Sequence, residues 1–425
     1  MTIPEGPAFW RICGNAVCES KVAGAMFWSR NRIDRILRLC IFLHICVAAH
    51  FPATGQITGR AGKPAAHSLG LTKFYDTPNP LPQAAPGQLI RSADFDQYNL
   101  PLRISAVRLL YYSRSANGAP VAASGVILFP DHTPPPGGWP VIAWAHTLNG
   151  VARQCAPSLD RNLQHGPFLA MYVNLGYAVV ATDYTGLGTN FRNAYADTVS
   201  NAWNVIDAIP AARSALPQLS ARWLALGTGD GGAAVIKVAE LEHDLKDANY
   251  LGSVAISPAA DLEDEYRAPG KLPPDAPLFL AYGIQTVFPQ FELTHMLTEK
   301  ALAVYQTIGK ACVQSDSSAN EGAAQSLKPN WQTDEIVQKF FRRNQLGHAP
   351  TQEPLLLING DTSPTIQQTS KIVDRMCGQK DWVQFEKFVG FDSGEVIGDS
   401  VRDQMSWIEA RFKDRATLND CPSRP

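Results

Sequence analysis

Short runs of apolar residues alternate along the chain with longer stretches in which apolar and polar residues recur at helical spacing. Uninterrupted apolar runs predict strands buried on both faces, and helices between them predict parallel pairing. The predicted strands of this kind are 141–146, 177–184, 221–227, 251–257, 353–360 and 383–390, and the predicted helices of the first half are 161–175, 200–215 and 231–245. The pattern therefore indicates an α/β protein with a mostly parallel sheet covered by helices on both faces.

The first two strands have a different pattern. Residues 105–130 contain two β-rich runs on either side of Asn117-Gly118, and this arrangement predicts a hairpin. Further on, about ninety residues separate the strand at 251–257 from the strand at 353–360, which is far longer than a loop in a compact sheet. We therefore predict an inserted helical cap.

The predicted division of the chain follows from this insertion. An α/β core is expected over residues 56–258 and 351–425, with the cap over residues 259–350. Within the cap, we expect one helix over 288–309 and another over 333–347. The acidic cluster that opens the cap, Asp261, Glu263, Asp264 and Glu265, is expected to be a solvated helix start rather than a cation site.

The N-terminal segment has the order of a secretory signal. Residues 29–38 are basic, residues 39–51 are apolar, and residues 52–55 supply small side chains near a cleavage point. Met26 is the better start of such a signal, and the apolar run is short for an uncleaved membrane anchor. We therefore treat residues 1–55 as a signal peptide with an N-terminal extension, and expect a secreted or periplasmic protein without a stable transmembrane span.

Cysteine positions agree with export. Of the eight cysteines, Cys13, Cys18, Cys40 and Cys46 lie in the N-terminal segment, and Cys155, Cys312, Cys377 and Cys421 remain. Four cysteines allow three pairings, and their spacing does not match zinc or redox C-x-x-C motifs. We predict disulfides between Cys155 and Cys312 and between Cys377 and Cys421, with free buried thiols as the alternative.

Charge excludes one class of partner. The chain has 425 residues, 45% of them hydrophobic, and a formal net charge of -2. No basic excess is available to bind a polyanion, so nucleic acid is not an expected partner.

Residues 227–232, Gly-Thr-Gly-Asp-Gly-Gly, permit two interpretations. They match the G-x-G-x-x-G dinucleotide fingerprint, and they also have the shape of a G-x-S-x-G nucleophile elbow with glycine at the serine position. A dinucleotide site needs an acidic residue at the end of the next strand. That strand ends at Ser257-Pro258, and the next acid, Asp261, opens the cap. The nicotinamide or flavin interpretation is therefore a minor alternative, and no cofactor is predicted.

The elbow interpretation gains support from other phrases of the chain. The segments VARQCAPS at 151–158 and ATDYTGLGT at 181–189 precede the elbow, and the segments LLLINGDTSP at 355–364 and FVGFDSGEV at 388–396 follow the cap. In these phrases the chain resembles the secretory lipase family of α/β-hydrolases, especially its bacterial members. The resemblance implies an α/β-hydrolase fold and an ester-hydrolysing triad in the chain order Ser, Asp, His.

The three triad positions of that family carry other residues here. The nucleophile position is Gly229, the aspartate position is Ser363 and the histidine position is Ser393. The oxyanion-loop positions implied by the resemblance are His146, Thr147 and Asp230. Glycine offers no nucleophile, and a serine hydroxyl does not act as a base near neutral pH.

The resulting hypothesis is a catalytically impaired or inactive member of the family that binds an acyl, ester or protein ligand beneath its cap. The alternative is an active lipase or esterase with a rearranged site, for which His146, at the end of a central strand, is the best-placed base. A structural role for that histidine is favoured. Glu240 and His243 imitate half of a two-metal motif, but there is no second copy, and no metal is predicted.

Overall fold

The computed structural model describes residues 68–259, 261–267, 272–313 and 325–421. The predicted signal peptide lies outside these residues, as does most of the polar stretch 315–326 between the predicted cap helices. In the described part of the chain, no helix is both long and apolar enough to cross a membrane.

A nine-stranded sheet forms the centre of the fold, in the order β1-β2-β3-β5-β4-β6-β7-β8-β9. The first three strands pair antiparallel, β3 pairs antiparallel with β5, and every pair from β5 to β9 is parallel. The strands are β1 (Leu89–Asp94), β2 (Ile104–Arg114), β3 (Pro120–Pro130), β4 (Trp139–Ala145), β5 (Ala178–Thr182), β6 (Leu219–Thr228), β7 (Tyr250–Ile256), β8 (Leu355–Gly360) and β9 (Val383–Phe388). The predicted hairpin and the mostly parallel sheet are confirmed.

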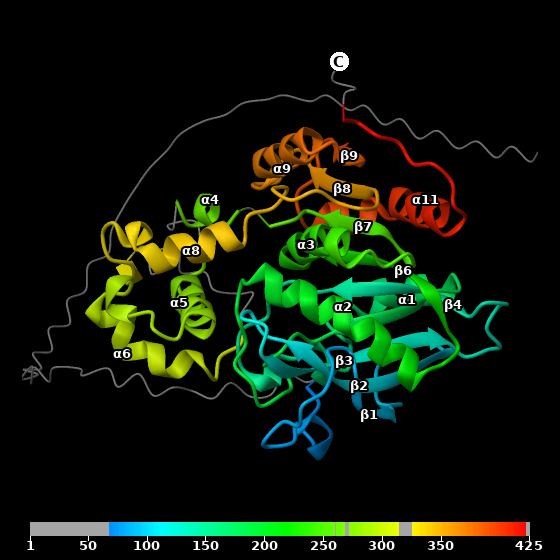
Figure 1. Cartoon of the computed structure of the whole chain (residues 1–425), viewed down its shortest axis with the longest axis horizontal. Helices are drawn as coiled ribbons and strands as arrows, with labels where there is room; N and C mark the ends of the chain where they lie inside the picture. The colour runs from blue at the N-terminus through cyan, green and yellow to red at the C-terminus, as the bar shows by residue number, and fades with distance from the viewer. Residues whose placement is uncertain (1–67, 260, 268–271, 314–324, 422–425) are drawn as a thin grey trace, which may run out of the picture. The chain divides into compact units, whose positions relative to one another are not determined.

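Helices cover both faces of this sheet (Figure 1). On one face, α2 (Thr198–Ala215), α3 (Asp230–Leu245) and α9 (Ile366–Gly378) share one apolar core with the strands. On the other face, α1 (Gly166–Asn174) and α11 (Val401–Phe412) form a second core, beside the short α10 (Glu395–Asp399). Strands such as β5 and β8 are therefore buried throughout, which explains the apolar runs that open them, 178–181 and 355–358.

The cap lies between β7 and β8, and its apolar core also includes Val151 and Ala196 from the loops after β4 and β5. Its helices are α4 (Leu262–Tyr266), α5 (Ala276–Val287), α6 (Glu299–Ile308) and α8 (Glu335–Arg343), and no named strand occurs among its described residues. The single helix expected over 288–309 is wrong. Phe288 precedes Pro289 and is driven out of the helical region, so α5 ends there, and α6 begins only after Thr298 caps its first turn.

Covalent and ionic contacts join the cap to the sheet. Both predicted disulfides are present, and the Cys155–Cys312 bond ties a loop that follows β4 to the cap. The sequence predicts a solvated carboxylate at Asp261. The structure instead shows an ion pair of 2.9 Å between Asp261 and Arg375 of α9. The start of the cap is thus held against the core helix that follows β8.

Glycines let α3 lie against the sheet at backbone distance. A Cβ at Gly231 would come within 2.0 Å of the Ala145 carbonyl oxygen, and one at Gly227 within 2.3 Å of the Gly231 oxygen. A Cβ at Gly232 would meet Pro258 at 3.0 Å. The spacing that resembles a dinucleotide fingerprint is therefore explained by the packing of α3 on β4, β6 and the segment after β7.

We predict that Gly231→Ala destabilises the fold by about 3 kcal/mol or more, because the added methyl group overlaps main-chain atoms that have no room to move. Gly378→Ala is the matched control, since a Cβ there meets nothing within 4 Å at the end of α9. The control is expected to be neutral or stabilising by up to about 1 kcal/mol. Urea unfolding of both variants measures the difference, and equal effects would contradict the packing argument.

Candidate active site

Gly229 forms the sharp turn between β6 and α3, with φ 55 and ψ -121. Its N–H donates to the Ile256 carbonyl at 3.1 Å, and its carbonyl accepts from the N–H groups of Ala233 and Ala259 at 3.0 and 2.9 Å. Left-handed φ has no steric cost for glycine. The strand-turn-helix geometry of a nucleophile elbow is therefore complete, without a side chain at its tip.

Thr147 occupies the space beside this tip. A Cβ built on Gly229 would lie 2.9 Å from Thr147 Oγ1, which is too close for a side chain to be added without movement of the threonine. The Thr147 hydroxyl is itself fixed, because it donates to Asp230 Oδ2 at 2.9 Å. A serine at position 229 would therefore meet a positioned hydroxyl group.

Asp230 brings a carboxylate to the loop after β4, where the sequence predicts the donors of an oxyanion site. Its Oδ2 also accepts from the Leu148 N–H, at 3.3 Å, so a backbone donor of the loop faces a protein carboxylate. Burial raises the pKa of Asp230, and hydrogen bonds from Thr147 and Leu148 oppose that rise. An oxyanion site needs donors free for developing negative charge. Here these two donors already have an acceptor.

A second carboxyl group lies in the field of the first. Burial, together with the charge of Asp230, raises the pKa of Glu265 in α4 to about 8. The surroundings of the elbow thus disfavour additional negative charge. This is the reverse of the electrostatic field that stabilises a tetrahedral oxyanion.

Ser363 and Ser393 are brought together from loops that follow β8 and β9. Their hydroxyl oxygens are 2.7 Å apart and share a hydrogen bond. Ser363 is only 3% exposed and also contacts Thr365 Oγ1 at 3.1 Å. The pair is a neutral contact between two hydroxyl groups, without an imidazole or a carboxylate.

Neither neighbouring aspartate activates these hydroxyl groups. Asp361 accepts from the Gly390 N–H, and Asp392 accepts from the N–H groups of Gly394 and Glu395. These backbone donors lower the pKa of Asp392. Both carboxylates therefore stabilise turns by accepting hydrogen bonds from backbone N–H groups.

His146 is fixed by main-chain groups. Its Nδ1 lies 2.6 Å from the Thr147 carbonyl oxygen, its Nε2 lies 3.3 Å from the Asp183 carbonyl oxygen, and its ring packs against Tyr184. Burial lowers its pKa to about 4. The imidazole is therefore neutral at physiological pH and holds the loop after β4.

Two of the segments that carry the family resemblance, 151–158 and 181–189, meet in a buried polar network. Asp183 accepts from the Ser158 N–H at 2.8 Å and from Ser124 Oγ at 2.6 Å, and Arg108 donates to the Ser158 carbonyl at 3.0 Å. Arg108 was not identified from the sequence, although an arginine inside an apolar strand is a signal for such a network.

Sequence reasoning also missed the direction of the Asp230 carboxylate, because no local pattern shows which donors a helix-start aspartate meets. No group of three or more metal-binding side chains occurs among the residues that the structure describes. Glu240 accepts from the Gly347 N–H at 2.6 Å and pairs with Lys237. It is thus a structural carboxylate.

Comparisons with known proteins identify the fold and the family. The esterase LipA of Xanthomonas oryzae, described as rice cell wall degrading, superposes with a TM-score of 0.65 at 18% identity, covering 78% of this chain and 100% of that one. Lipase A of Candida antarctica superposes with a TM-score of 0.69 at 15% identity, covering 82% of this chain and 87% of that one. These likenesses confirm the α/β-hydrolase fold. No protein with a curated description matches the sequence. The family model described as secretory lipase matches residues 165–420, and the chain therefore belongs to the secretory lipase family.

Proposed function

We propose that this secretory lipase family member is catalytically silent and binds a ligand instead of hydrolysing one. The observation that carries the proposal is Gly229, which forms a complete elbow without a nucleophile. The hydrogen-bonded hydroxyl pair of Ser363 and Ser393, at the two other family positions, supports it.

The expected fall in turnover from each missing catalytic group favours an inactive protein over one with reduced activity. In the serine protease subtilisin, a worked case in which the triad was removed stepwise, loss of the nucleophile alone lowers turnover by about 10⁶-fold, and the residual rate comes from binding and the oxyanion hole. In this chain the Leu148 N–H also faces Asp230, so that residual contribution is reduced as well.

The expected ligand is an acyl or ester molecule, and a protein ligand is the alternative. Leu148, which bonds Asp230 through its backbone, packs its side chain against the apolar core of the cap. Tyr195 stacks on Phe279 of α5, with ring centroids 5.1 Å apart. Apolar side chains thus continue from the elbow into the cap, and such surroundings suit a hydrocarbon chain better than a charged ligand.

We further propose that the protein works in an oxidising compartment outside the cytosol. Two disulfides in the described residues support this, since such bonds persist where thiols are not kept reduced. The basic and apolar segments of residues 29–51 supply the matching signal.

The rearranged-site alternative requires His146 as the base. Its ring nitrogens face the carbonyl groups of Thr147 and Asp183, and Asn149 contacts Nδ1 at 3.1 Å. No serine hydroxyl is hydrogen-bonded to this ring within the described residues. This arrangement favours silence over a site built around His146.

We predict that the purified protein hydrolyses neither short-chain nor long-chain p-nitrophenyl esters and is not labelled by a fluorophosphonate. Gly229→Ser alone should leave both results unchanged, because the new hydroxyl would lack a base and would meet Thr147 Oγ1. Adding Thr147→Gly, Ser363→Asp and Ser393→His should give a detectable rate and labelling at position 229. Robust hydrolysis by the unmodified chain that survives Ser363→Ala and Ser393→Ala would overturn the proposal.

We predict that the His146 imidazole stays neutral in the folded protein down to about pH 4, as its lowered pKa requires. The unfolded chain binds this proton below its ordinary pKa of about 6.5, so folding stability falls as the pH falls from 6.5 to 4, by roughly 3 kcal/mol. NMR titration of the histidine ring resonances, with the urea-unfolded protein as reference, measures both pKa values. A folded-state pKa near 6.5 would instead support a site that uses this base.

We predict saturable binding of a long-chain acyl ether, which cannot be hydrolysed, as measured by isothermal titration calorimetry. Leu148→Asp should weaken this binding at least about tenfold, because a second carboxylate would enter an apolar wall beside Asp230. Leu102→Asp is the control, since Leu102 is 92% exposed on the loop before β2. Equal affinity for all three proteins would place the ligand elsewhere.

A further inference from the structure

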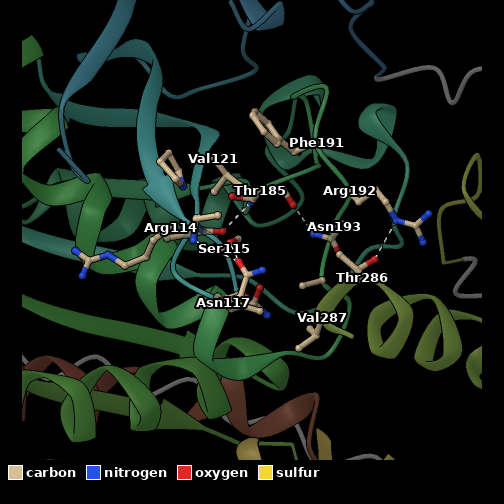
Figure 2. A pocket seen from close by; sticks show the side chains of 17 residues that line it. Arg114, Ser115, Asn117, Val121, Thr185, Phe191, Arg192, Asn193, Thr286 and Val287 are labelled. Atoms are coloured by element: carbon tan, nitrogen blue, oxygen red, sulfur yellow. Dashed lines mark hydrogen bonds between the residues drawn. The ribbon is translucent and has the colours of Figure 1, made fainter. Parts of the chain in front are cut away.

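A pocket of about 340 Å³ opens at the carboxyl end of β5, and Figure 2 shows its lining. The tip of the β2–β3 hairpin, the loop after β5, the first turns of α2 and the end of α5 contribute to it. Its lining includes Asn117, Val121, Thr185, Phe191, Asn193 and Asn201. Gly229, Ser363, Ser393 and His146 do not line it, so this pocket is separate from the elbow.

Three buried residues of this lining carry side-chain polar atoms without a hydrogen-bond partner among the described residues, although Asn193 Nδ2 donates to the Thr185 carbonyl oxygen at 2.8 Å. Thr185 Oγ1 and Asn193 Oδ1 have none, although these residues are only 8% and 2% exposed. Asn201, 3% exposed, makes no hydrogen bond through its side-chain amide either. Unpaired buried polar groups are costly and uncommon in folded proteins. Three around one pocket indicate a missing polar partner.

A neighbouring amide and a neighbouring hydroxyl group, by contrast, do form hydrogen bonds. Asn204 Oδ1 accepts from the Thr185 N–H at 2.7 Å, and its Nδ2 donates to Ser113 Oγ at 2.7 Å. Thr182 Oγ1 contacts the Tyr111 hydroxyl at 2.6 Å and accepts from the Tyr184 N–H. Around the pocket, therefore, the hydroxyl group of Thr182 and the amide of Asn204 have partners, whereas Thr185 Oγ1, Asn193 Oδ1 and the Asn201 amide have none in the described part of the chain.

The charges around the pocket are already engaged. Arg114 is paired with Asp207 at 2.7 Å, and Arg192 donates to Thr286 Oγ1 at 3.2 Å while lying over the ring of Tyr282. Figure 2 shows both guanidinium groups directed away from the hollow between them. No carboxylate lines this hollow. A matching ligand therefore carries no net charge.

We propose that this pocket binds an uncharged molecule with several hydroxyl groups. Asn193 Oδ1 accepts only, whereas the Thr185 hydroxyl and the Asn201 amide both donate and accept. Hydroxyl groups satisfy all three, because each donates and accepts. Val121 and Phe191 add apolar surface for the C–H side of such a ligand. The volume suits a small molecule.

This inference does not depend on the loss of the triad. The same chemistry is offered by the glycerol unit of a glyceride and by a saccharide ring, and the experiment separates these two sources. Saturation-transfer difference NMR is recorded on the full protein with glycerol, a 1-monoacylglycerol and glucose, each titrated to saturation. Thermal shifts are unsuitable, because polyols stabilise folded proteins by exclusion from their surface.

The expected result is a saturable signal from at least one of these ligands, reduced at least about tenfold in affinity by Thr185→Val and by Asn201→Leu. Thr185→Val should leave the thermal midpoint unchanged or raised, because it removes an unpaired hydroxyl. Thr182→Val is the matched control: it breaks two hydrogen bonds and lowers the midpoint, but the ligand affinity stays that of the parent.

Saturation by glycerol and the monoacylglycerol alone assigns the glycerol unit, and saturation by glucose alone assigns a saccharide. No saturable signal from any of the three ligands would overturn the proposal and leave bound water as the partner of these groups. Equal affinity in the parent, Thr185→Val and Asn201→Leu would also overturn it. Gly229→Ser with its three companion changes should bind as the parent does, so the outcome is distinguishable from that of the activity test.

Discussion

The contact of α3 with the backbone of β4 and β6 fixes the positions of the other groups at this edge of the sheet. Gly231 lies against the Ala145 carbonyl with no space for a Cβ, and this contact fixes the distance between the start of α3 and the sheet. Gly229 must then turn with a positive φ, and Asp230 must point its carboxylate toward Thr147. The packing of α3 on the sheet therefore requires these glycines, whatever the activity of the site.

The sequence allowed most of the sheet to be predicted, because strands such as β8 are buried on both faces and begin with a continuous apolar run, Leu355 to Ile358. The cap was harder to predict, since Phe288 and Pro289 interrupt a stretch whose apolar pattern is continuous. Pro289 disfavours the helical backbone conformation at the residue before it, and this local effect outweighed the helical spacing of the apolar residues. The predicted site positions Gly229, Ser363 and Ser393 came from resemblance to a family. Once the positions were aligned, the sequence itself showed that none of the three carries the family's triad residue.

The pairings between side chains could not be predicted in the same way. The bond between Ser363 and Ser393 joins loops after two strands, and Thr147 meets Asp230 across 83 positions. The unpaired atoms of Thr185 and Asn193 are invisible to any pattern, because hydrogen-bond satisfaction is a property of three-dimensional neighbours. The buried network around Asp183 gives two segments of the family resemblance, 151–158 and 181–189, a structural role, because it holds their loops together.

The Cys155–Cys312 bond changes what the cap is able to do. Two chain connections, after β7 and before β8, would leave an axis about which a lid could swing, and a covalent tie to the loop after β4 removes that freedom. The disulfide thus restricts movement of the cap relative to the sheet. A ligand of the proposed kind would leave from beneath the cap only through side-chain rearrangement and local loosening, so its residence time would be longer with the bond intact than after a reductant opens it.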